Sequence, residues 1–199
     1  MQAHIYDVES LQCFTPSVSE SHHVGGINQV RCAGDGKQFA TAGKDGTVKL
    51  WDIASSKCIA TLDSAHDKMV RIMVYLHSSP SCYDMTCDSL RPQEVTSVAF
   101  SKNQKYLLSA GRNNAVVLWD LAAKRPLLYF NGHRHARHRS QACFSHNEEF
   151  VITSDDASGE LVFWNSRTGE LAQRIGAGHT SSIRWVTHSP VAPHLVTCR

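Results

Sequence analysis

The chain has 199 residues, a hydrophobic content of 42%, a charged content of 19% and a formal net charge of +2. This length can bury a sizeable core, the composition is that of an ordinary globular protein, and so small a net charge gives no argument for nucleic-acid binding by itself. The sequence contains no run of about 18 apolar residues, which argues against a membrane span. Met1 leads into no apolar segment, so no secretory signal is expected.

Cysteine usage indicates a reducing compartment. The seven cysteines are an odd number, most of them lie in strand-like runs, and none forms a Cys-x-x-Cys pair. We therefore expect free thiols in a nuclear or cytosolic protein.

The chain repeats a short strand that ends in an aromatic residue followed by an acid or an amide. Tyr6-Asp7 ends the first of these strands, and Trp51-Asp52 ends the second 45 residues later. Trp119-Asp120 and Trp164-Asn165 are again 45 residues apart, but 68 residues separate the second strand ending from the third. The sequence therefore predicts units with a period of about 45 residues and about 23 extra residues in the middle interval.

The segment 1–23 is interpreted as the last part of one unit, and the first complete unit spans residues 24–64. Alternating polar and apolar side chains predict its strands. They are Ile27–Cys32, Gln38–Ala42, Thr47–Trp51 and Lys57–Leu62. Asp45-Gly46 lies between the second and third strands and predicts a two-residue type I′ turn, because glycine accepts the positive φ that this turn needs.

The segment Lys68–Gln93 interrupts the period. Its first part, Met69–Leu76, is apolar, and the remainder is rich in turn residues. The segment is either a binding loop, a family-specific insertion, or intron sequence that has been translated. The repeat pattern resumes in register at Glu94, so we expect the segment to be dispensable for the fold.

Two more complete units are expected at residues 94–131 and 139–176, and the first part of another at 179–199. Their strands are Val95–Phe100, Tyr106–Ala110, Ala115–Trp119 and Leu127–Phe130, then Gln141–Phe144, Phe150–Thr153, Glu160–Trp164 and Leu171–Ile175, and finally Ser182–Thr187 and His194–Thr197. Four-stranded units that repeat in this way build rings of blades. The sequence predicts an all-β propeller, as an incomplete ring of about three full and two partial four-stranded blades.

Each unit also carries a His, a Ser or Thr, an Asp or Asn, and a Trp. The expected sets are His23, Thr41, Asp45 and Trp51; His66, Ser109, Asn113 and Trp119; and His133, Thr153 or Ser154, Asp155 or Asp156, and Trp164. Because the set repeats in every blade and one copy lacks the carboxylate, a catalytic Ser-His-Asp role is disfavoured. We expect buried hydrogen-bonded chains that hold the blades together, and no enzymatic activity.

The most basic stretch of the chain is Gly132–Arg139. Its arginines are Arg134, Arg137 and Arg139, and its histidines are His133, His135 and His138. The arginines are candidates for a contact with a protein partner or with nearby RNA, and the alternative is a solvated loop between blades. Zinc binding by the histidines is disfavoured, since the first of them is assigned to a blade set and no Cys or carboxylate lies nearby. The sequence contains no phosphate-binding glycine loop or catalytic motif, so we expect no cofactor.

The Gly-His pairs at 132–133 and 178–179, together with the Trp-Asp strand endings, resemble the repeats of the WD40 family over nearly the whole chain. Longer runs resemble the branch of that family found in the cleavage stimulation factor complex. These runs are Ile5–Asp7 with Leu11–Phe14, Lys44–Asp52, Ala65–Asp67, Phe100–Tyr106, Arg139–Ala142, Phe144–Glu148 and His188–Pro190. The resemblance implies a nuclear scaffold in pre-mRNA 3′-end cleavage and polyadenylation. It also implies binding to the HAT-repeat subunit of the same complex, indirect or weak contact with RNA, and no association with a membrane.

Three departures from that branch keep an alternative open. The N-terminal helical dimerisation domain, the first blades and the last strands of the closing blade are not in the sequence, and Lys68–Gln93 has no recognised counterpart. The alternative function is a WD40 substrate receptor or adaptor of another nuclear or cytosolic complex, such as a ubiquitin ligase. The sequence contains no F-box or similar adaptor motif.

Overall fold

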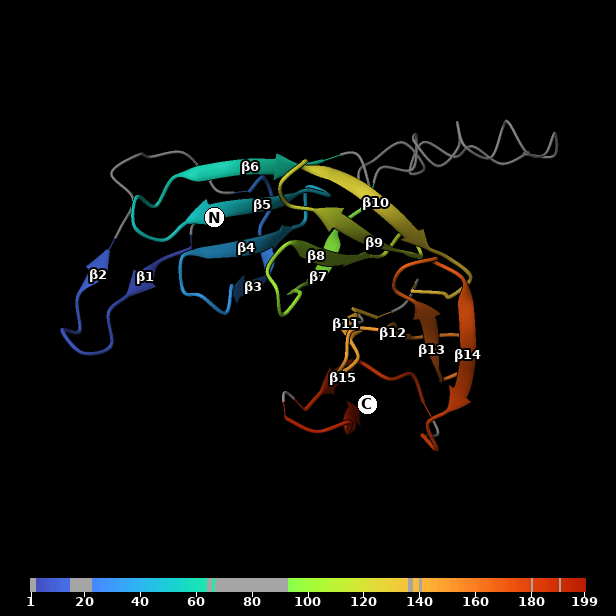
Figure 1. Ribbon diagram of the computed structural model, residues 1–199. Helices are drawn as coiled ribbons and strands as arrows, with labels where there is room; N and C mark the ends of the chain where they lie inside the picture. Colours follow the sequence, from blue (N-terminus) through green and yellow to red (C-terminus); the bar gives the residue numbers. More distant parts are fainter. Residues whose placement is uncertain are drawn as a thin grey trace, which may run out of the picture.

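A computed structural model describes residues 3–14, 23–63, 66, 93–135, 138–139, 141–179, 181–189 and 191–199 of the chain. Within these residues the chain forms sixteen β-strands in five antiparallel sheets and no helix. The predicted all-β class and the incomplete propeller are therefore confirmed, and Figure 1 shows the sheets following one another along an arc. Apart from Gln93, the segment Lys68–Gln93 lies outside the described residues.

Three sheets are complete blades in which the strands pair in chain order. Blade 1 contains β3 (Ile27–Cys32), β4 (Gln38–Gly43), β5 (Val48–Asp52) and β6 (Cys58–Leu62). Blade 2 contains β7 (Val95–Phe100), β8 (Tyr106–Gly111), β9 (Ala115–Asp120) and β10 (Arg125–Phe130). Blade 3 contains β11 (Cys143–Phe144), β12 (Phe150–Ser154), β13 (Glu160–Asn165) and β14 (Leu171–Gly176).

Two further sheets have two strands each. They are β1 (Ile5–Tyr6) with β2 (Cys13–Phe14), and β15 (Trp185–His188) with β16 (Leu195–Cys198). The turn after β1 is built like the turn after β5, because Asp7 accepts hydrogen bonds from the next residues as Asp52 does. The pair β1–β2 thus corresponds to the outer half of a blade. The pair β15–β16 corresponds to the inner half.

The hydrophobic core lies between neighbouring blades, because the middle strands of each blade are covered on both faces. Leu50 of blade 1 and Trp119 of blade 2 belong to one buried cluster. Leu118 of blade 2 belongs to a second cluster with Phe144 and Trp164 of blade 3. Burial of a side chain of this size stabilises a fold by about 1.5–3 kcal/mol. The outer strands are less covered, and all six residues of β14 are exposed.

The connection between blades 1 and 2 leaves and returns at one place. The backbone amide of Gln93 donates a hydrogen bond to the carbonyl of His66 over 3.4 Å. The two residues that flank the segment 67–92 are therefore held together, and β7 starts two residues after Gln93.

The hairpin at Asp45-Gly46 is longer than predicted. Gly46 has a φ of 79°, but Asp45 has no positive φ, so the turn is not of type I′. The amide of Gly43 donates to the carbonyl of Thr47 over 3.0 Å and closes a wider loop. This loop forms because the Asp45 carboxylate accepts hydrogen bonds from both the amide and the hydroxyl of Thr47.

The strand ends lie within two residues of the predicted ones, with one exception. β15 begins at Trp185, three residues after the predicted start. The carbonyl of Ile183 accepts a hydrogen bond from Ser154 Oγ of blade 3 over 2.9 Å and does not join the ladder. The outer strand of each complete blade also contains a β-bulge, at Ile59, Leu127 and Ala172.

Candidate functional site

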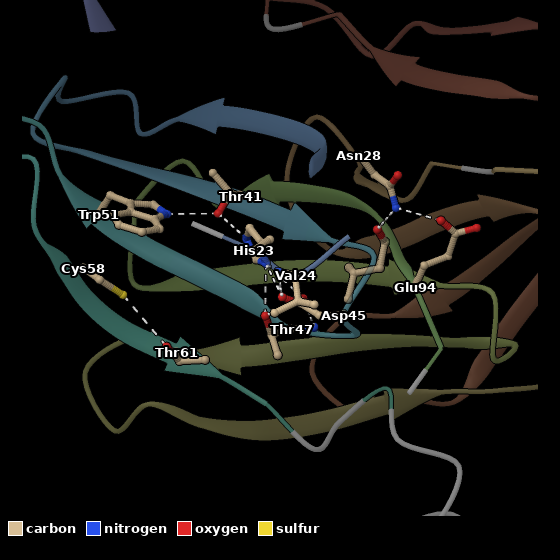
Figure 2. Close-up of polar contacts among 11 residues, drawn as sticks. His23, Val24, Asn28, Thr41, Asp45, Thr47, Trp51, Cys58, Thr61 and Glu94 are labelled. Carbon is tan, nitrogen blue, oxygen red and sulfur yellow. Dashed lines mark hydrogen bonds and ion pairs between the residues drawn. The ribbon is translucent and has the colours of Figure 1, made fainter. Parts of the chain in front are cut away.

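In blade 1, the four predicted side chains form one continuous hydrogen-bonded chain (Figure 2). The indole Nε1 of Trp51 donates to Thr41 Oγ1 over 2.9 Å. Thr41 Oγ1 lies 2.7 Å from Nε2 of His23, and Nδ1 of His23 lies 3.0 Å from the carboxylate of Asp45. Strands β5 and β4 and the residue at the entrance to the blade are thereby joined through side chains.

The order of donors and acceptors in this chain assigns the tautomer of His23. The ionised carboxylate of Asp45 can only accept, so Nδ1 of His23 carries the hydrogen and donates it to Asp45. Nε2 of His23 then accepts from the hydroxyl of Thr41, whose oxygen accepts from Trp51. Burial lowers the pKa of His23, and the contact with Asp45 opposes that shift. Burial raises the pKa of Asp45, but hydrogen bonds from Thr47 and His23 outweigh it and hold that pKa below its ordinary value. A neutral imidazole beside a carboxylate therefore suits the whole chain.

Blade 2 repeats the arrangement with an amide at its end. Trp119 Nε1 donates to Ser109 Oγ over 2.8 Å, and Ser109 Oγ lies 2.7 Å from His66 Nε2. His66 Nδ1 lies 3.1 Å from Asn113 Oδ1. All four residues are buried. Because Asn113 is neutral, its hydrogen bond lacks the charge assistance that Asp45 supplies in blade 1.

Blade 3 does not form the predicted set. The histidine that approaches Thr153 is His135, with Nε2 at 3.2 Å from Thr153 Oγ1 and 2.6 Å from the carbonyl oxygen of Ser154. Trp164 Nε1 donates to the carbonyl of Asn131 over 3.1 Å, and the Thr153 hydroxyl donates to the carbonyl of Gln141 over 3.0 Å. Tryptophan and threonine are thus not bonded to each other in this blade.

The predicted residue His133 lies beside this group. It is buried and packs edge-on against the rings of Trp164 and His135, with centroid distances of 5.1 and 4.3 Å. The assignment followed the Gly-His pair and was wrong about the contact with Thr153. In blade 1 the histidine precedes the threonine by 18 residues, and the same interval leads from Thr153 back to His135.

One extra residue in the hairpin between β12 and β13 accounts for the displaced acid. The paired residues Ala42 and Val48 enclose five residues in blade 1, whereas Ser154 and Leu161 enclose six in blade 3. The position that corresponds to Asp45, four residues after the threonine, is therefore Ala157 in blade 3. The two acids that precede this position, Asp155 and Asp156, have other partners.

Asp155 and Asp156 bind outside the predicted set. Asp155 is buried and pairs with Arg174 of β14, with Nη1 and Oδ2 at 3.1 Å. Arg174 also donates to the carbonyl of Gly132, so it ties the outer strand to the loop that carries the histidines. Asp156 accepts a hydrogen bond from the amide of His138 over 3.1 Å. An ion pair toward the outer strand thus replaces the His–Asp contact of blade 1.

A fourth contact of this kind joins the loop before β15 to β16. His179 Nε2 lies 2.9 Å from Thr197 Oγ1, and the two residues are again 18 apart. No polar set was predicted for this part of the chain. The Gly-His pair at 178–179 together with the interval of 18 residues was the signal that could have found it.

The basic stretch is described only in part. Arg134 and Arg139 are exposed, whereas Arg137 lies outside the described residues. The backbone carbonyl of Arg134 accepts a hydrogen bond from the amide of Asp156, which fixes the loop against the β12–β13 hairpin. The side chain of Arg134 therefore projects from a backbone that is held in place.

Arg139 belongs to a charged group that connects three blades. Its guanidinium lies 3.7 Å from Glu94, which also binds Arg112 over 2.9 Å and Asn28 of β3 over 3.1 Å (Figure 2 shows the Asn28 contact). Burial raises the pKa of Glu94, but Arg112, Asn28 and Arg139 outweigh it and hold that pKa below its ordinary value. Glu94 immediately precedes β7, so this group also fixes the start of blade 2.

The described residues offer no evident metal or membrane site. No three His, Cys, Asp or Glu side chains among them are placed to hold a metal ion. None of the described segments is a helix of the length and apolarity that a membrane span needs. The described cysteines are Cys13, Cys32, Cys58, Cys143 and Cys198, all with free thiols. Cys143 alone among them is buried, and burial raises the pKa of its thiol to about 12.

Comparison with known proteins matches these repeats to a β-propeller family. Residues 5–192 match the family described as "Nucleolar protein 10-like, N-terminal domain". The chain is 37% identical to cleavage stimulation factor subunit 50 of Arabidopsis thaliana over 98% of this chain and 40% of that protein.

Two further relatives are more distant. A WD repeat-containing protein 26 homolog of Arabidopsis thaliana is 23% identical over 96% of this chain and 34% of its own length. GID complex subunit 7 of Schizosaccharomyces pombe is 27% identical over 75% of this chain and 27% of its own length. The chain therefore spans less than half the length of the relatives it matches.

Proposed function

We propose that this protein is a non-enzymatic scaffold. The premise is that the chain belongs to the WD40 β-propeller family, with a match to the nucleolar protein 10-like N-terminal domain. Its proposed place is the cleavage stimulation factor complex, in pre-mRNA 3′-end cleavage and polyadenylation. The observation that carries this proposal is the 37% identity to a cleavage stimulation factor subunit over 98% of the chain. Localisation to the nucleus and binding to the HAT-repeat subunit of that complex are parts of the same proposal.

The contacts of the polar sets support the absence of catalysis. In blades 1 and 2 the histidine, the hydroxyl and the indole are buried and bonded to one another. A nucleophile and its base need access to a substrate. We also propose that each set holds one blade together. The domain boundaries predicted from the sequence are part of the same proposal.

The stretch Arg134–Arg139 is the proposed contact with a partner or with nearby RNA. Arg134 is exposed and its backbone is fixed, which suits a surface that recognises carboxylates or phosphates. Changing Arg134, Arg137 and Arg139 together to Ala is expected to weaken the contact and flatten its salt dependence. Each phosphate contact adds about 0.7–0.9 to the steepness with which log K falls as log[salt] rises. Unchanged binding of both the HAT-repeat subunit and RNA across a salt series would remove this stretch from the proposal.

Affinity purification from nuclear extract tests the proposed complex. The tagged full chain is expected to capture 3′-processing factors, including the HAT-repeat subunit, and the tag alone is the control. The relative named as a subunit of the GID complex favours a second candidate, a WD40 receptor or adaptor of another complex. A ubiquitin ligase is the example that we propose for such a complex. Capture of cullin adaptors in place of 3′-processing factors supports that candidate and contradicts the first.

A further inference from the structure

A groove of about 610 Å³ runs between blades 2 and 3. We call its apolar lining the floor; it consists of Tyr106, Leu118, Leu127, Leu128 and Phe144, and the polar lining includes Ser101, Asn103 and Ser166. Tyr106 begins β8, whereas the polar set of blade 2 lies toward the other end of that strand, so the groove is separate from the set. Sites that bind small molecules or side chains of a partner have this size and combine apolar surface with polar groups.

The backbone of β10 directs a large apolar side chain into this groove. Leu127 is the bulged residue of the strand, because Pro126 and Leu128 pair with adjacent residues of β9 and leave Leu127 between them. A bulge changes the direction in which a side chain points. Leu127 lines the groove and remains 40% exposed.

The corresponding contact between blades 1 and 2 is bridged. Lys124, at the fifth position of the turn that starts at Asp120, donates from Nζ to the carbonyl of Ile59, which is the bulged residue of β6. The same position of the turn in blade 3 is Gly169, which has a φ of 77° and no side chain to reach across. A Cβ there would lie 3.7 Å from Leu128 Cδ2. The groove beside Leu127 is therefore open where its counterpart is bridged.

The rim of the groove is more acidic than basic. Glu148, Glu149 and Arg167 lie on it. Glu148 accepts a hydrogen bond from the amide of Lys102, whereas Glu149 is exposed and projects from the turn between β11 and β12. Two carboxylates against one guanidinium repel the phosphates of RNA and attract Lys or Arg.

We propose that this groove docks a short linear segment of a protein partner, with an aliphatic or aromatic side chain on the apolar floor and a basic residue beside Glu149. The proposal rests on the scaffold function proposed above and adds a surface to it. A second hollow of about 260 Å³ lies on the other side of the same turn, lined by Ile152, Phe163 and Leu195. Asn147 lines both spaces, so the two hollows adjoin at this turn.

The first test uses the full chain and a phage-displayed library of random twelve-residue peptides. Selected peptides are synthesised with a fluorescent label and measured by anisotropy. We expect Lys or Arg close to a large apolar residue in them, and Leu127→Arg to weaken their binding at least tenfold. Leu171→Arg is the matched control, because Leu171 is an exposed leucine on β14 outside the groove, and it should change binding less than twofold. A library that yields no binding peptide, or peptides that bind Leu127→Arg as tightly as the wild type, overturns the proposal.

Two further variants separate docking from loss of fold. Gly169→Lys places a lysine where blade 2 has Lys124, and it is expected to weaken binding at least fivefold by covering the floor. Glu149→Lys is expected to weaken basic peptides at least fivefold, whereas Glu170→Lys, on an exposed residue of the same blade, should leave them unchanged. Circular dichroism melts establish that each variant is folded. Equal binding by Glu149→Lys and Glu170→Lys, or displacement of the peptide by a poly-uridine oligonucleotide, contradicts a docking site for basic peptides.

The two proposals fail in different ways. Capture of the HAT-repeat subunit together with an empty peptide selection contradicts the groove alone. Peptide binding that Leu127→Arg abolishes, without capture of 3′-processing factors, contradicts the proposed complex alone.

Discussion

In blade 1, Trp51, Thr41, His23 and Asp45 are bonded end to end, whereas in blade 3 the tryptophan and the threonine donate to two separate backbone carbonyls. Both blades bury their tryptophan almost completely, and both bury a histidine. The same degree of burial is therefore reached with different polar partners.

The difference shows which parts of the repeat are coupled. In blade 1 the hydroxyl of Thr41 is shared, so its loss affects an indole and an imidazole together. In blade 3 the ion pair of Asp155 with Arg174 takes over the tie between the hairpin and the rest of the blade. The two arrangements accompany a difference of one residue in the length of the hairpin. The polar chain is thus one of at least two arrangements that place these polar groups in a buried blade, and in blade 3 Nδ1 of His135 has no hydrogen-bond partner among the described residues.

The largest effect is expected at the tryptophan of the linked blade. Trp51→Ala removes a buried aromatic that stacks on Phe39 at 5.9 Å, and such truncations cost about 3–5 kcal/mol. It also takes the indole donor from Thr41, which adds about 1 kcal/mol. Urea denaturation of the full chain measures the change. A midpoint equal to that of the wild type would show that Trp51 does not anchor blade 1.

The shared hydroxyl gives the sharpest contrast between the blades. Thr41→Val leaves the indole of Trp51 and Nε2 of His23 without their shared partner, and each lost partner of a buried group costs about 1–3 kcal/mol. Thr153→Val leaves His135 with the carbonyl of Ser154 at 2.6 Å, so we expect about 1 kcal/mol. Equal losses for the two variants in the same denaturation assay would show that the linked chain adds nothing to blade 1.

The ion pair between Asp155 and Arg174 should contribute to the stability of blade 3. Arg174→Met leaves the buried carboxylate of Asp155 without its guanidinium partner, and we expect a loss of about 1–2 kcal/mol because Arg174 is itself partly exposed. Asp155→Asn in the same chain should recover part of that loss, since the unpaired charge is then removed. A double variant less stable than Arg174→Met would contradict an electrostatic origin.

Acidification should weaken blade 1 through its carboxylate. Because the pKa of Asp45 lies below its ordinary value, its contribution is present above that ordinary value and is lost as the pH falls through the folded-state pKa. Asp45→Asn is expected to cost about 1 kcal/mol at neutral pH, and the gap to the wild type should close as the pH falls below the ordinary pKa of an aspartate. The lowered pKa of His23 acts in the same direction, because the unfolded chain takes up its proton first. A difference in stability between Asp45→Asn and the wild type that grows in acid would contradict a stabilising role of the ionised carboxylate.

The smallest effect is expected from removing the segment between blades 1 and 2. His66 precedes Ser109 by 43 residues, which is 25 more than the interval of 18 in blade 1. Deleting residues 67–91 restores that interval and keeps Gln93 beside His66, so thermal stability should be equal to or above that of the wild type. Loop closure supports this, because its entropy changes by only about 0.6 kcal/mol per doubling of length. Loss of the cooperative melt would place a needed strand inside the deleted segment.

Much of the fold was readable from the sequence because the repeat is periodic. Trp51, Trp119 and Trp164 set the register of three blades, and the alternation of apolar residues placed the strands. The polar chains of blades 1 and 2 could be assigned because each hairpin there encloses five residues. The hairpin of blade 3 is one residue longer. A pattern of residue types cannot predict which partner a carboxylate binds when the loop that carries it changes length. Identifying His135 as the histidine of blade 3 would have required the interval of 18 residues to Thr153, because the Gly-His pattern points to His133.

The groove between blades 2 and 3 had no sequence signal. It depends on the absence of a side chain at Gly169 and on the bulge at Leu127, and both acquire meaning only when two blades lie side by side. Contacts between neighbouring repeats depend on how the repeats differ, whereas periodicity reports what they share.

The burial of Cys143 in the inner strand of blade 3 has a kinetic consequence. A thiol whose pKa is about 12 is almost entirely protonated at neutral pH and shielded from alkylating reagents. Its rate of modification is then set by how often β11 detaches from β12, while Cys32 and Cys58 in blade 1 react from exposed positions. Pulsed alkylation read by mass spectrometry would therefore time the opening of one blade against an internal reference in the same molecule, with no engineered probe.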